Sequence, residues 1–394
     1  EMCIRDRNDD EADGEDTNAD GPSVGAPGDW QYLYFGATSS GNLLDNVVVR
    51  YGGGYGSYGS VYIATSSMTV ENSTITQGNG HGIRLQASTG DGTIRIINND
   101  ITGHAARGIF VNYSNGDFDI DIEDNTIAGN GQEGIYIGNS TVRTFDIINN
   151  SITENGLDGI EVYYSTASGV NGDFAFVNID NNTIADNGEY GIRAVSSTLS
   201  VTANEIYNHS YPYDGIYLDG DSFLNSTVAP NSPTPPDNNI YDNDLNVIII
   251  GGSLSQAAAW SSGTYVVDNL TVASTGSLTL AAGVVVKFRQ NGWMTINGSL
   301  VASGTTLDPI YFTSLQDDTA DGEDTNADGP SVGAPGDWYY LYFDAGSSGN
   351  LLDNVVVSYG GGYGSYGSVY IATSSMTVEN STITQGNGHG IRLQ

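Results

Sequence analysis

The chain has 394 residues, of which 47 are acidic and only 11 are lysine or arginine, and its formal net charge is −36. This charge argues against a nucleic-acid partner and against an anionic membrane surface, because both require a basic protein surface. The single cysteine, Cys3, excludes an internal disulfide framework. With one lysine in the whole chain, free cations such as Ca²⁺ are the natural counter-ions of the acidic side chains.

A long internal repeat organises the chain. Residues 9–86 recur at 317–394, and the second copy stops in mid-pattern at Gln394. The first seven residues, EMCIRDR, resemble a translated sequencing-adapter remnant, so we expect 1–7 to be non-native. We expect the chain to be a fragment of a longer array of neighbouring repeats, an arrangement that serves length and multivalency more often than catalysis. The copies differ at five positions: Glu11/Thr319, Gln31/Tyr339, Gly36/Asp344, Thr38/Gly346 and Arg50/Ser358.

Residues 8–30, and their copy at 317–338, are predicted to be acidic, calcium-type loops. The run DTNADG at 16–21 matches the first half of an EF-hand loop, in which alternate oxygens point inward and glycine permits a sharp turn. The bidentate glutamate of loop position 12 is replaced by Pro27, so the loop is not an EF-hand and resembles the half-loops of dockerin and thrombospondin type 3 repeats. The alternative is a solvated acidic turn. The predicted ligands are Asp16, Asn18, Asp20, Asp324, Asn326 and Asp328, with extra oxygens from Asp13, Glu15 or Asp29.

Residues 31–250 repeat a shorter phrase with successive spacings of 26, 26, 25, 32 and 22 residues. The alternation at 118–122 is typical of a strand with one buried face, and two turns and two shorter strands follow it within one phrase. Each phrase therefore predicts one coil, and stacked coils bury a column of isoleucines. These are Ile75, Ile101, Ile127, Ile152, Ile184 and Ile206. Two residues earlier stand Ser73, Asn99, Asn125, Asn150, Asn182 and Asn204; asparagine suits left-handed turns and can stack into an amide ladder.

The phrase Asn-x-Ile-x-x-Asn-x-x-x-Gly-Ile resembles the repeat of the pectin-lyase-like superfamily, over about 40–250. Residues 264–316 resemble the opening coils of large bacterial surface proteins of that fold. We therefore predict an all-β, right-handed parallel β-helix solenoid with acidic loop insertions. Its predicted parts are a β-helix at 31–250, a linker at 251–263, opening coils at 264–316 and a truncated second copy at 339–394. The resemblance implies a secreted or cell-surface adhesin or array protein, and it leaves open a carbohydrate-active enzyme.

One outward residue per coil is expected to form a ladder with steps of ~5 Å along the third strands. Rings that alternate with charges suit a polysaccharide or a cell-surface glycan, because sugars stack on rings and their hydroxyls bind charged groups. The alternative is ordinary exposed strand residues, since aromatic residues favour strands. The candidates are Arg84, Phe110, Tyr136, Glu161, Arg193 and Tyr217.

The sequence offers one incomplete catalytic set. The resemblance implies carboxylates with an Arg or Lys base in lyases, and Asn-Thr-Asp, Asp-Asp, Gly-His-Gly and Arg-x-Lys motifs in hydrolases. Here only Gly80-His81-Gly82 matches, the Asp-Asp pairs fall in the acidic loops, and no lysine follows Arg84. We therefore expect a binding module, whereas clustered carboxylates with a nearby arginine on one face would favour an enzyme.

Overall fold

The structure is a computed structural model of the chain. It describes residues 2–4, 9–10, 14, 16, 21, 23–55, 58–87, 90–167, 176–209, 214–224, 238–243, 245, 247–260, 262–326 and 328–394. These residues form β-strands and turns that pack into two compact units, 1–213 with 237–239 and 214–236 with 240–394. In the described part of the chain, no helix has the length and apolar character needed to cross a membrane.

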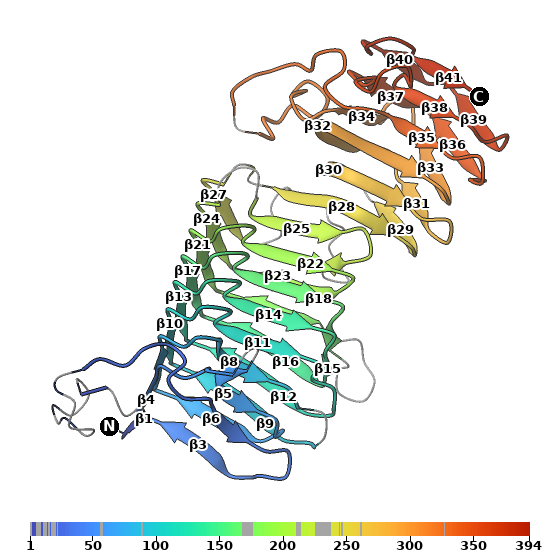
Figure 1. The fold of residues 1–394 in the computed structure, drawn as a ribbon. Coiled ribbons are helices and arrows are strands. Elements are labelled where there is room, and N and C mark those ends of the chain that lie inside the picture. The colour runs from blue at the N-terminus through green and yellow to red at the C-terminus, as the bar shows by residue number, and fades with distance from the viewer. Residues whose placement is uncertain are drawn as a thin grey trace. The chain divides into compact units, whose positions relative to one another are not determined.

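Each coil of the first unit adds one strand to each of three parallel sheets (Figure 1). Sheet 1 contains β3 (Asn42–Asp45), β6 (Met68–Glu71), β9 (Thr93–Ile97), β12 (Asp119–Glu123), β16 (Thr144–Ile148), β20 (Val177–Asp180) and β23 (Thr198–Thr202). Sheet 2 contains β4 (Val47–Arg50), β7 (Thr74–Thr76), β10 (Asp100–Thr102), β13 (Thr126–Ala128), β17 (Ser151–Thr153), β21 (Thr183–Ala185) and β24 (Glu205–Tyr207). Sheet 3 contains β2 (Leu33–Phe35), β5 (Gly59–Ile63), β8 (His81–Leu85), β11 (Ile109–Asn112), β14 (Ile135–Gly138), β18 (Ile160–Tyr163) and β22 (Ile192–Val195).

The isoleucine column sits in sheet 2, as the spacing predicts. Ile101 pairs with Ile75 on one side and with Ile127 on the other, and the register continues through Ile152 and Ile184. These side chains are fully buried. Each apolar face is therefore covered by the next coil, which is the arrangement that a solenoid requires.

The predicted asparagine ladder runs inside the turn between sheets 1 and 2. The Asn99 backbone N–H donates to Asn125 Oδ1 at 2.9 Å, and the Asn125 N–H donates to Asn150 Oδ1 at 3.0 Å. Each amide also donates to a strand carbonyl, as Asn125 Nδ2 does to Ile96 O at 2.8 Å. These buried amides thus satisfy backbone groups that the turn leaves without ladder partners.

The left-handed backbone of this turn lies one residue earlier than we expected. Positive φ angles occur at Asn98 (55°), Asp124 (56°) and Asn149 (59°), directly before the ladder asparagines. The ladder residues therefore serve as amide donors and acceptors, and their neighbours supply the left-handed conformation.

A second inner ladder follows the isoleucines and includes histidine. The backbone N–H of His104 donates to Asn130 Oδ1, and the N–H of Asn130 donates to Asn155 Oδ1. The His104 ring accepts from the Gly78 N–H at Nδ1, 3.1 Å, so its Nε2 carries the proton and donates to Ile75 O at 2.9 Å. His104 therefore occupies an asparagine position of the ladder.

The second unit repeats the architecture with longer strands. Its largest sheet contains β25 (Ile216–Asp219), β28 (Ile248–Leu254), β30 (Gly263–Val272), β32 (Val284–Ile296), β34 (Ile310–Ser314), β35 (Leu341–Phe343), β37 (Val355–Ser358), β38 (Val369–Ile371), β40 (Thr382–Thr384) and β41 (Ile391–Leu393). A second sheet contains β29 (Ala257–Trp260), β31 (Ser277–Leu280), β33 (Ser299–Ser303), β36 (Asn350–Asp353) and β39 (Met376–Glu379). Strand β32 pairs with β34 through its first half and with β35 through its second half, so it bends around a corner of the coil.

Two segments that we placed outside the β-helix carry strands. Residues 251–263, expected to be a linker, carry most of β28 and all of β29, because Trp260 is buried against Tyr265 with ring centroids 4.2 Å apart. Met2–Ile4, in the stretch expected to be non-native, forms β1 and pairs with β4. The segment 225–239, which its prolines at 230, 233, 235 and 236 predict to be a protruding loop, lies almost wholly outside the described residues. The remaining strands are β15 (Thr141–Val142), β19 (Thr166–Ala167), β26 (Phe223–Leu224) and β27 (Asn239–Tyr241).

Candidate functional site

The two acidic loops share one hydrogen-bonded frame. In the second copy, Ser331 donates to Asp318 Oδ2 from its backbone N (2.7 Å) and its hydroxyl (3.2 Å), which closes the loop at its base. In the first copy, Ser23 donates to Asp10 Oδ2 in the same way, at 2.9 and 3.0 Å. The half-loop turn is also shared, because Gly329 N–H donates to Asp324 Oδ2 at 2.9 Å, and the Gly21 N–H donates to Asp16 at the same distance.

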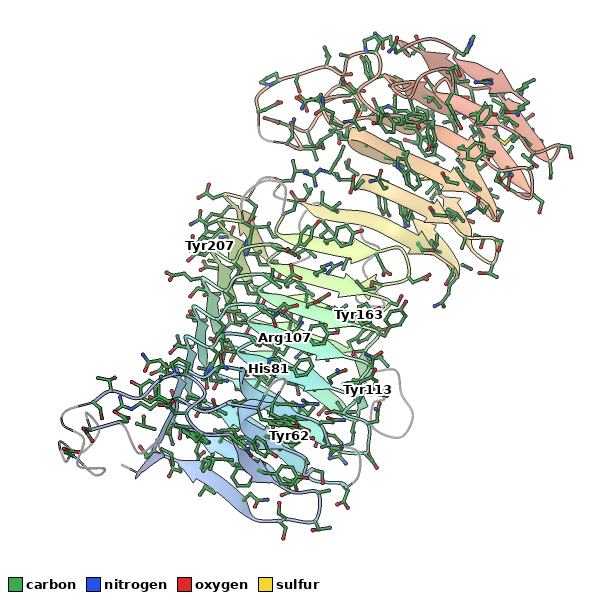
Figure 2. The ribbon with its side chains drawn as sticks, viewed as in Figure 1. Tyr62, His81, Arg107, Tyr113, Tyr163 and Tyr207 are labelled. Atoms are coloured by element: carbon green, nitrogen blue, oxygen red, sulfur yellow. The ribbon has the colours of Figure 1, made fainter. Side chains whose placement is uncertain are left out.

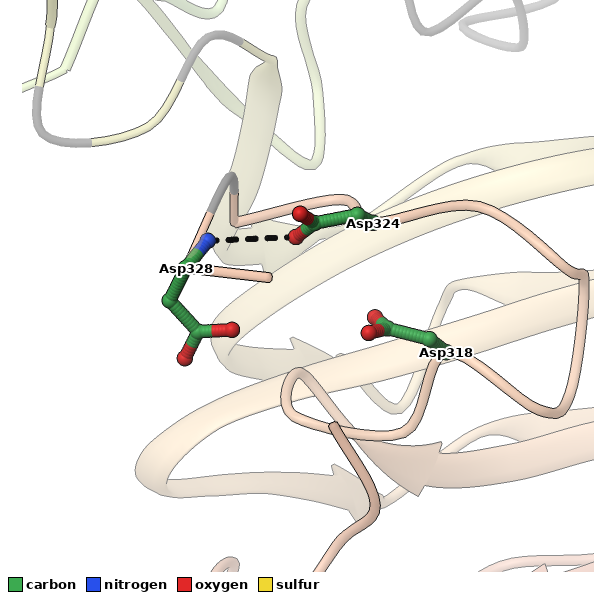
Figure 3. Close-up of side chains that lie close together, drawn as sticks. All are labelled: Asp318, Asp324 and Asp328. Atoms are coloured by element: carbon green, nitrogen blue, oxygen red, sulfur yellow. Dashed lines mark hydrogen bonds between the residues drawn. The ribbon is translucent and has the colours of Figure 1, made fainter. Parts of the chain in front are cut away.

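Three carboxylates of the second loop converge (Figure 3). Asp318, Asp324 and Asp328 each place one oxygen so that the three oxygens lie within 4.8 Å of one another. The Asp328 backbone N–H donates to Asp324 Oδ1 at 3.2 Å, and Asn326 Nδ2 donates to Asp328 Oδ2 at 2.9 Å. The predicted ligands Asp324, Asn326 and Asp328 are thus close together, whereas Asn18 and Asp20 of the first copy lie outside the described residues.

Some oxygens of these loops are buried and have no partner in the protein. They are Oδ1 of Asp10, Oδ1 of Asp318 and Oδ1 of Asn326, and the whole Asp10 side chain is only 8% exposed. A buried acceptor without a hydrogen bond is costly, and hard divalent cations take such oxygens as ligands. Asp318 and Asp10 were not among our predicted ligands, because they precede the half-loop by several residues and only the closed base of the loop brings Asp318 near it.

Different side chains anchor each loop to its coil. In the second unit, the fully buried Lys287 pairs with Asp321 at 2.9 Å and donates to Thr325 Oγ1 at 2.6 Å. In the first unit, Arg50 pairs with the buried Asp9 through two nitrogens, at 2.5 and 3.0 Å.

The outward ladder of sheet 3 has the register that we predicted. Strand pairing places Phe110 beside Arg84 and Tyr136, and it extends the row to Glu161 and Arg193. Figure 2 shows Tyr62, His81 and Arg107 on the face formed by the strands of this sheet, whereas Tyr207 lies on the edge formed by sheet 2. The sixth candidate, Tyr217, belongs to the second unit, where it pairs with Ile249 of β28.

The middle of this ladder is more covered than we expected. Phe110 is 9% exposed and Glu161 is 7% exposed, because long side chains from the same coil and from the neighbouring coils lie over them. The guanidinium of Arg107 lies 5.0 Å from the Phe110 ring centre and 4.4 Å from that of Tyr136, and Arg84 lies 5.7 Å from Phe110 on another side. The arginines and rings therefore satisfy one another along the solenoid.

A second column, which our sequence reasoning missed, lines the turn beside the ladder. Its members are the residues immediately before the repeated Gly-Ile pairs, and that position is the signal that could have identified them: His81, Arg107, Glu133, Asp158 and Tyr190. The Arg107 guanidinium binds both Glu133 oxygens, at 2.9 and 3.1 Å, and Arg193 pairs with Glu161 at 2.9 Å.

The two columns bring three buried carboxyl groups together. Burial, followed by a hydrogen bond with the Glu133 carboxyl, raises the pKa of Glu161 to about 7. Burial also raises the pKa of Asp158 well above its usual range, although the Tyr190 N–H donates to its Oδ1 at 2.9 Å. Clustered carboxyls beside Arg107 and Arg193 are the arrangement that we expected to favour an enzyme.

His81, from the single matching catalytic motif, is unsuited to act as a charged acid. Its ring stacks on Phe110 with centroids 4.3 Å apart, and its Nδ1 accepts the Arg107 backbone N–H at 3.3 Å. Burial, helped by Arg107 and Arg84, lowers the pKa of His81 to about 3. The imidazole is therefore neutral near pH 7.

Comparisons with known proteins agree with this architecture. A family model described as "Right handed beta helix region" matches residues 107–301. The chain is a right-handed parallel β-helix repeat protein. A second model, described as "Periplasmic copper-binding protein (NosD)", matches residues 28–174 of this β-helix protein. Searches of curated proteins and of solved structures gave no match.

Proposed function

We propose that this β-helix protein is a non-catalytic adhesin or array module, secreted or held at the cell surface, whose acidic loops bind Ca²⁺. The observation that supports calcium is the converging oxygens of Asp318, Asp324 and Asp328, with an unpartnered Asp318 Oδ1 that recurs as Asp10 Oδ1 in the other copy. Ca²⁺ accepts irregular sets of oxygen ligands better than Mg²⁺ does. Binding would offset the repulsion between these carboxylates and stiffen the loops.

Calorimetry and limited proteolysis of the whole chain test this proposal. We expect two sites per chain with Kd of ~10⁻⁴–10⁻³ M, typical of extracellular modules, and slower cleavage of both loops in Ca²⁺ than in Mg²⁺. The triple change Asp318→Asn, Asp324→Asn and Asp328→Asn should remove one site, and the corresponding changes at Asp10, Asp16 and Asp20 should remove the other. Asp91→Asn, at an exposed acid outside the loops, is the matched control. No heat of binding and identical cleavage in chelator would reduce the loops to solvated turns.

Copper binding, as the second family model describes it, is not part of the function that we propose. Copper sites favour imidazole, thiolate and thioether ligands. Within 28–174 the histidines are His81 and His104; His104 has both ring nitrogens bonded to the backbone, and Met68 is buried in the core. Among the described residues, the cluster of potential ligands is made of carboxylates, which suit hard cations. The periplasmic description agrees with the export that we propose.

The outward ladder supports glycan binding as part of the same function. Arg84, Tyr136 and Arg193 are partly exposed along one row, with one residue per coil. Such a row would follow an extended polysaccharide, which offers hydroxyls to the charged groups and ring faces to Tyr136.

A second candidate function, a carbohydrate-active enzyme such as a lyase, hydrolase or epimerase, is favoured by the Glu133, Asp158 and Glu161 cluster. A carboxyl group with a pKa near 7 can donate or accept a proton at neutral pH. Assays for new reducing ends, for unsaturated products and for C5 epimerisation on a neutral glucan and on polygalacturonate test this candidate. Turnover that Glu161→Gln abolishes would support an enzyme, and its absence on both polymers would count against one.

A further inference from the structure

We propose that each unit carries a tyrosine platform that binds a neutral, hydroxyl-rich polysaccharide by stacking on tyrosine rings. This inference rests on the glycan-binding part of the proposed function, and it names the contact surface and the saccharide class. The first platform consists of Tyr32, Tyr34, Tyr55, Tyr58, Tyr62 and Arg84, and the second consists of Tyr340, Tyr342, Tyr363, Tyr366, Tyr370 and Arg392.

The first platform forms where a glycine-rich segment folds back onto sheet 3. Tyr58 comes from this segment, and its ring lies 5.1 Å from that of Tyr32 and 5.3 Å from that of Tyr62. Tyr34 and Tyr62, on the paired strands β2 and β5, have ring centres 5.1 Å apart. The Arg84 guanidinium lies 5.0 Å from the Tyr58 ring centre, so it supports the rings from the next coil.

The second platform has the same arrangement in an independently packed unit. Tyr366 lies 5.2 Å from Tyr340 and 4.7 Å from Tyr370, and Tyr342 lies 5.0 Å from Tyr370. Arg392 lies 5.1 Å from the Tyr370 ring centre. The six platform residues are identical in the two copies, and both sets fold into the same cluster.

The outer rings of these platforms are open to solvent, unlike the middle of the outward ladder. Tyr34 is 56% exposed, Tyr55 is 60% exposed, and Tyr363 is 50% exposed. The Tyr34 ring lies over Gly36, so close that a side chain at position 36 would contact the ring at 3.4 Å from its Cβ. A ring that rests along the strand keeps its other face free, and sugars stack on such faces.

The negative charge of the chain favours a neutral ligand on the platforms. None of the six residues is acidic, yet the net charge of −36 would repel nucleic acids, anionic lipids and polyuronates at long range. The Arg84 guanidinium is covered by Tyr58 and Tyr62 and donates to Gln86 Oε1 at 2.9 Å, so it is not a free anion site. Phenol rings offer a stacking face and a hydroxyl edge, which fits a neutral sugar. Two identical platforms also suit a polymer that repeats its own binding unit.

Two of the five substitutions between the copies, at 31 and 36, fall beside platform tyrosines. Tyr339 adds a ring 5.0 Å from Tyr363, and Asp344 accepts the Tyr342 hydroxyl at 3.1 Å. The second platform therefore has a larger stacking surface, and we expect it to bind the same polymer more tightly.

Affinity electrophoresis of the whole chain tests the proposal, with hydroxyethylcellulose, galactomannan and starch as neutral probes and polygalacturonate as the anionic probe. We expect retardation by at least one neutral probe. Tyr34→Ala with Tyr55→Ala, or Tyr342→Ala with Tyr363→Ala, should weaken binding several-fold through lost avidity, and all four changes together should weaken it at least ~10-fold. Tyr34, Tyr55 and Tyr363 are exposed and Tyr342 is partly exposed, and unchanged circular dichroism should confirm that the variants fold.

The matched control uses two tyrosines of similar exposure outside the platforms. Tyr113→Asn and Tyr164→Asn suit their left-handed φ angles of 54° and 46°, and they should leave binding unchanged. Binding to polygalacturonate alone, or to no probe, would overturn the proposal. Neutral binding that survives the four-tyrosine variant but is lost in Tyr136→Ala with Arg193→Ala would overturn the platforms and leave the outward ladder as the glycan site.

Discussion

The two copies of the long repeat place identical strands in different surroundings. Ile83 of β8 is fully buried beneath β11, whereas its counterpart in β41, Ile391, is 42% exposed, since among the described residues β41 pairs with β38 alone. Met68 and Met376 differ in the same way. The sequence of a coil therefore specifies its backbone, and the neighbouring coil determines how much of its apolar face is buried.

The largest effect should separate these two isoleucines. Ile83→Asp would bury an unpaired carboxylate and should lower the free energy of unfolding of the first unit by about 3–5 kcal/mol, whereas Ile391→Asp should cost less than about 1 kcal/mol. Urea unfolding followed by circular dichroism measures both changes. Equal losses in the two variants would mean that stacking of coils does not provide the burial.

The anchors of the acidic loops offer a second contrast between the copies. Asp9 is paired with Arg50, but the copy has Ser358 there, and Asp317 instead accepts from Thr313 Oγ1 at 2.5 Å and from Thr319 Oγ1 at 2.6 Å. Two of the five substitutions between the copies, at 11 and 50, thus exchange an ion pair for hydrogen bonds.

Arg50→Ser should remove the ion pair of the buried Asp9 and destabilise the first loop by about 2–4 kcal/mol. Adding Glu11→Thr should restore part of this loss, because a hydroxyl can then donate to Asp9 as Thr319 does to Asp317. The rates of limited proteolysis within residues 9–30 measure both the loss of loop stability and its recovery. Strictly additive effects would show that the substitutions at 11 and 50 are unrelated.

The carboxyl cluster predicts a pH effect confined to the first unit. The pKa of Glu161 is raised from 4.5 to about 7, so its contribution to stability is complete below about pH 4.5 and is lost as the pH rises through about 7. Glu161→Gln should therefore flatten the fall in Tm between about pH 5 and 8. If the Tm of this variant fell with pH as steeply as the Tm of the wild type, the raised pKa of Glu161 would be contradicted.

The smallest effect concerns His104, whose pKa is lowered by burial from 6.5 to about 4. Its contribution is present above about pH 6.5 and is lost as the pH falls toward about 4, because the unfolded state binds the proton first. His104→Asn should change stability at pH 8 by less than about 1 kcal/mol, since Asn130 makes equivalent bonds, to the His104 N–H and to Ile101 O. Thermal melts should show that the variant loses less stability than the wild type as the pH falls toward about 4. An unchanged loss would mean that another group causes it.

The periodic sequence made the coils predictable, whereas long side chains and loop closure made parts of the site unpredictable. The spacing of Ile101 and Asn99 predicted a column and a ladder because identical residues recur once per coil. The cover over Phe110 was not predicted, because it depends on the reach of two long side chains: Arg107, three residues earlier in the same coil, and Arg84, in the preceding coil. Asp318 was missed because loop closure, rather than local spacing, brings it to Asp324 and Asp328.

The most direct test of calcium binding by the loops is a crystal structure of the chain grown in millimolar CaCl₂, with anomalous scattering to identify the ion. We predict an ion in the second loop bound by Asp318, Asp324 and Asp328 with Ca–O distances of about 2.3–2.6 Å, and a matching ion at Asp10 and Asp16. Ordered loops that hold no ion under these conditions, with Asp318 Oδ1 bonded to water, would contradict the account.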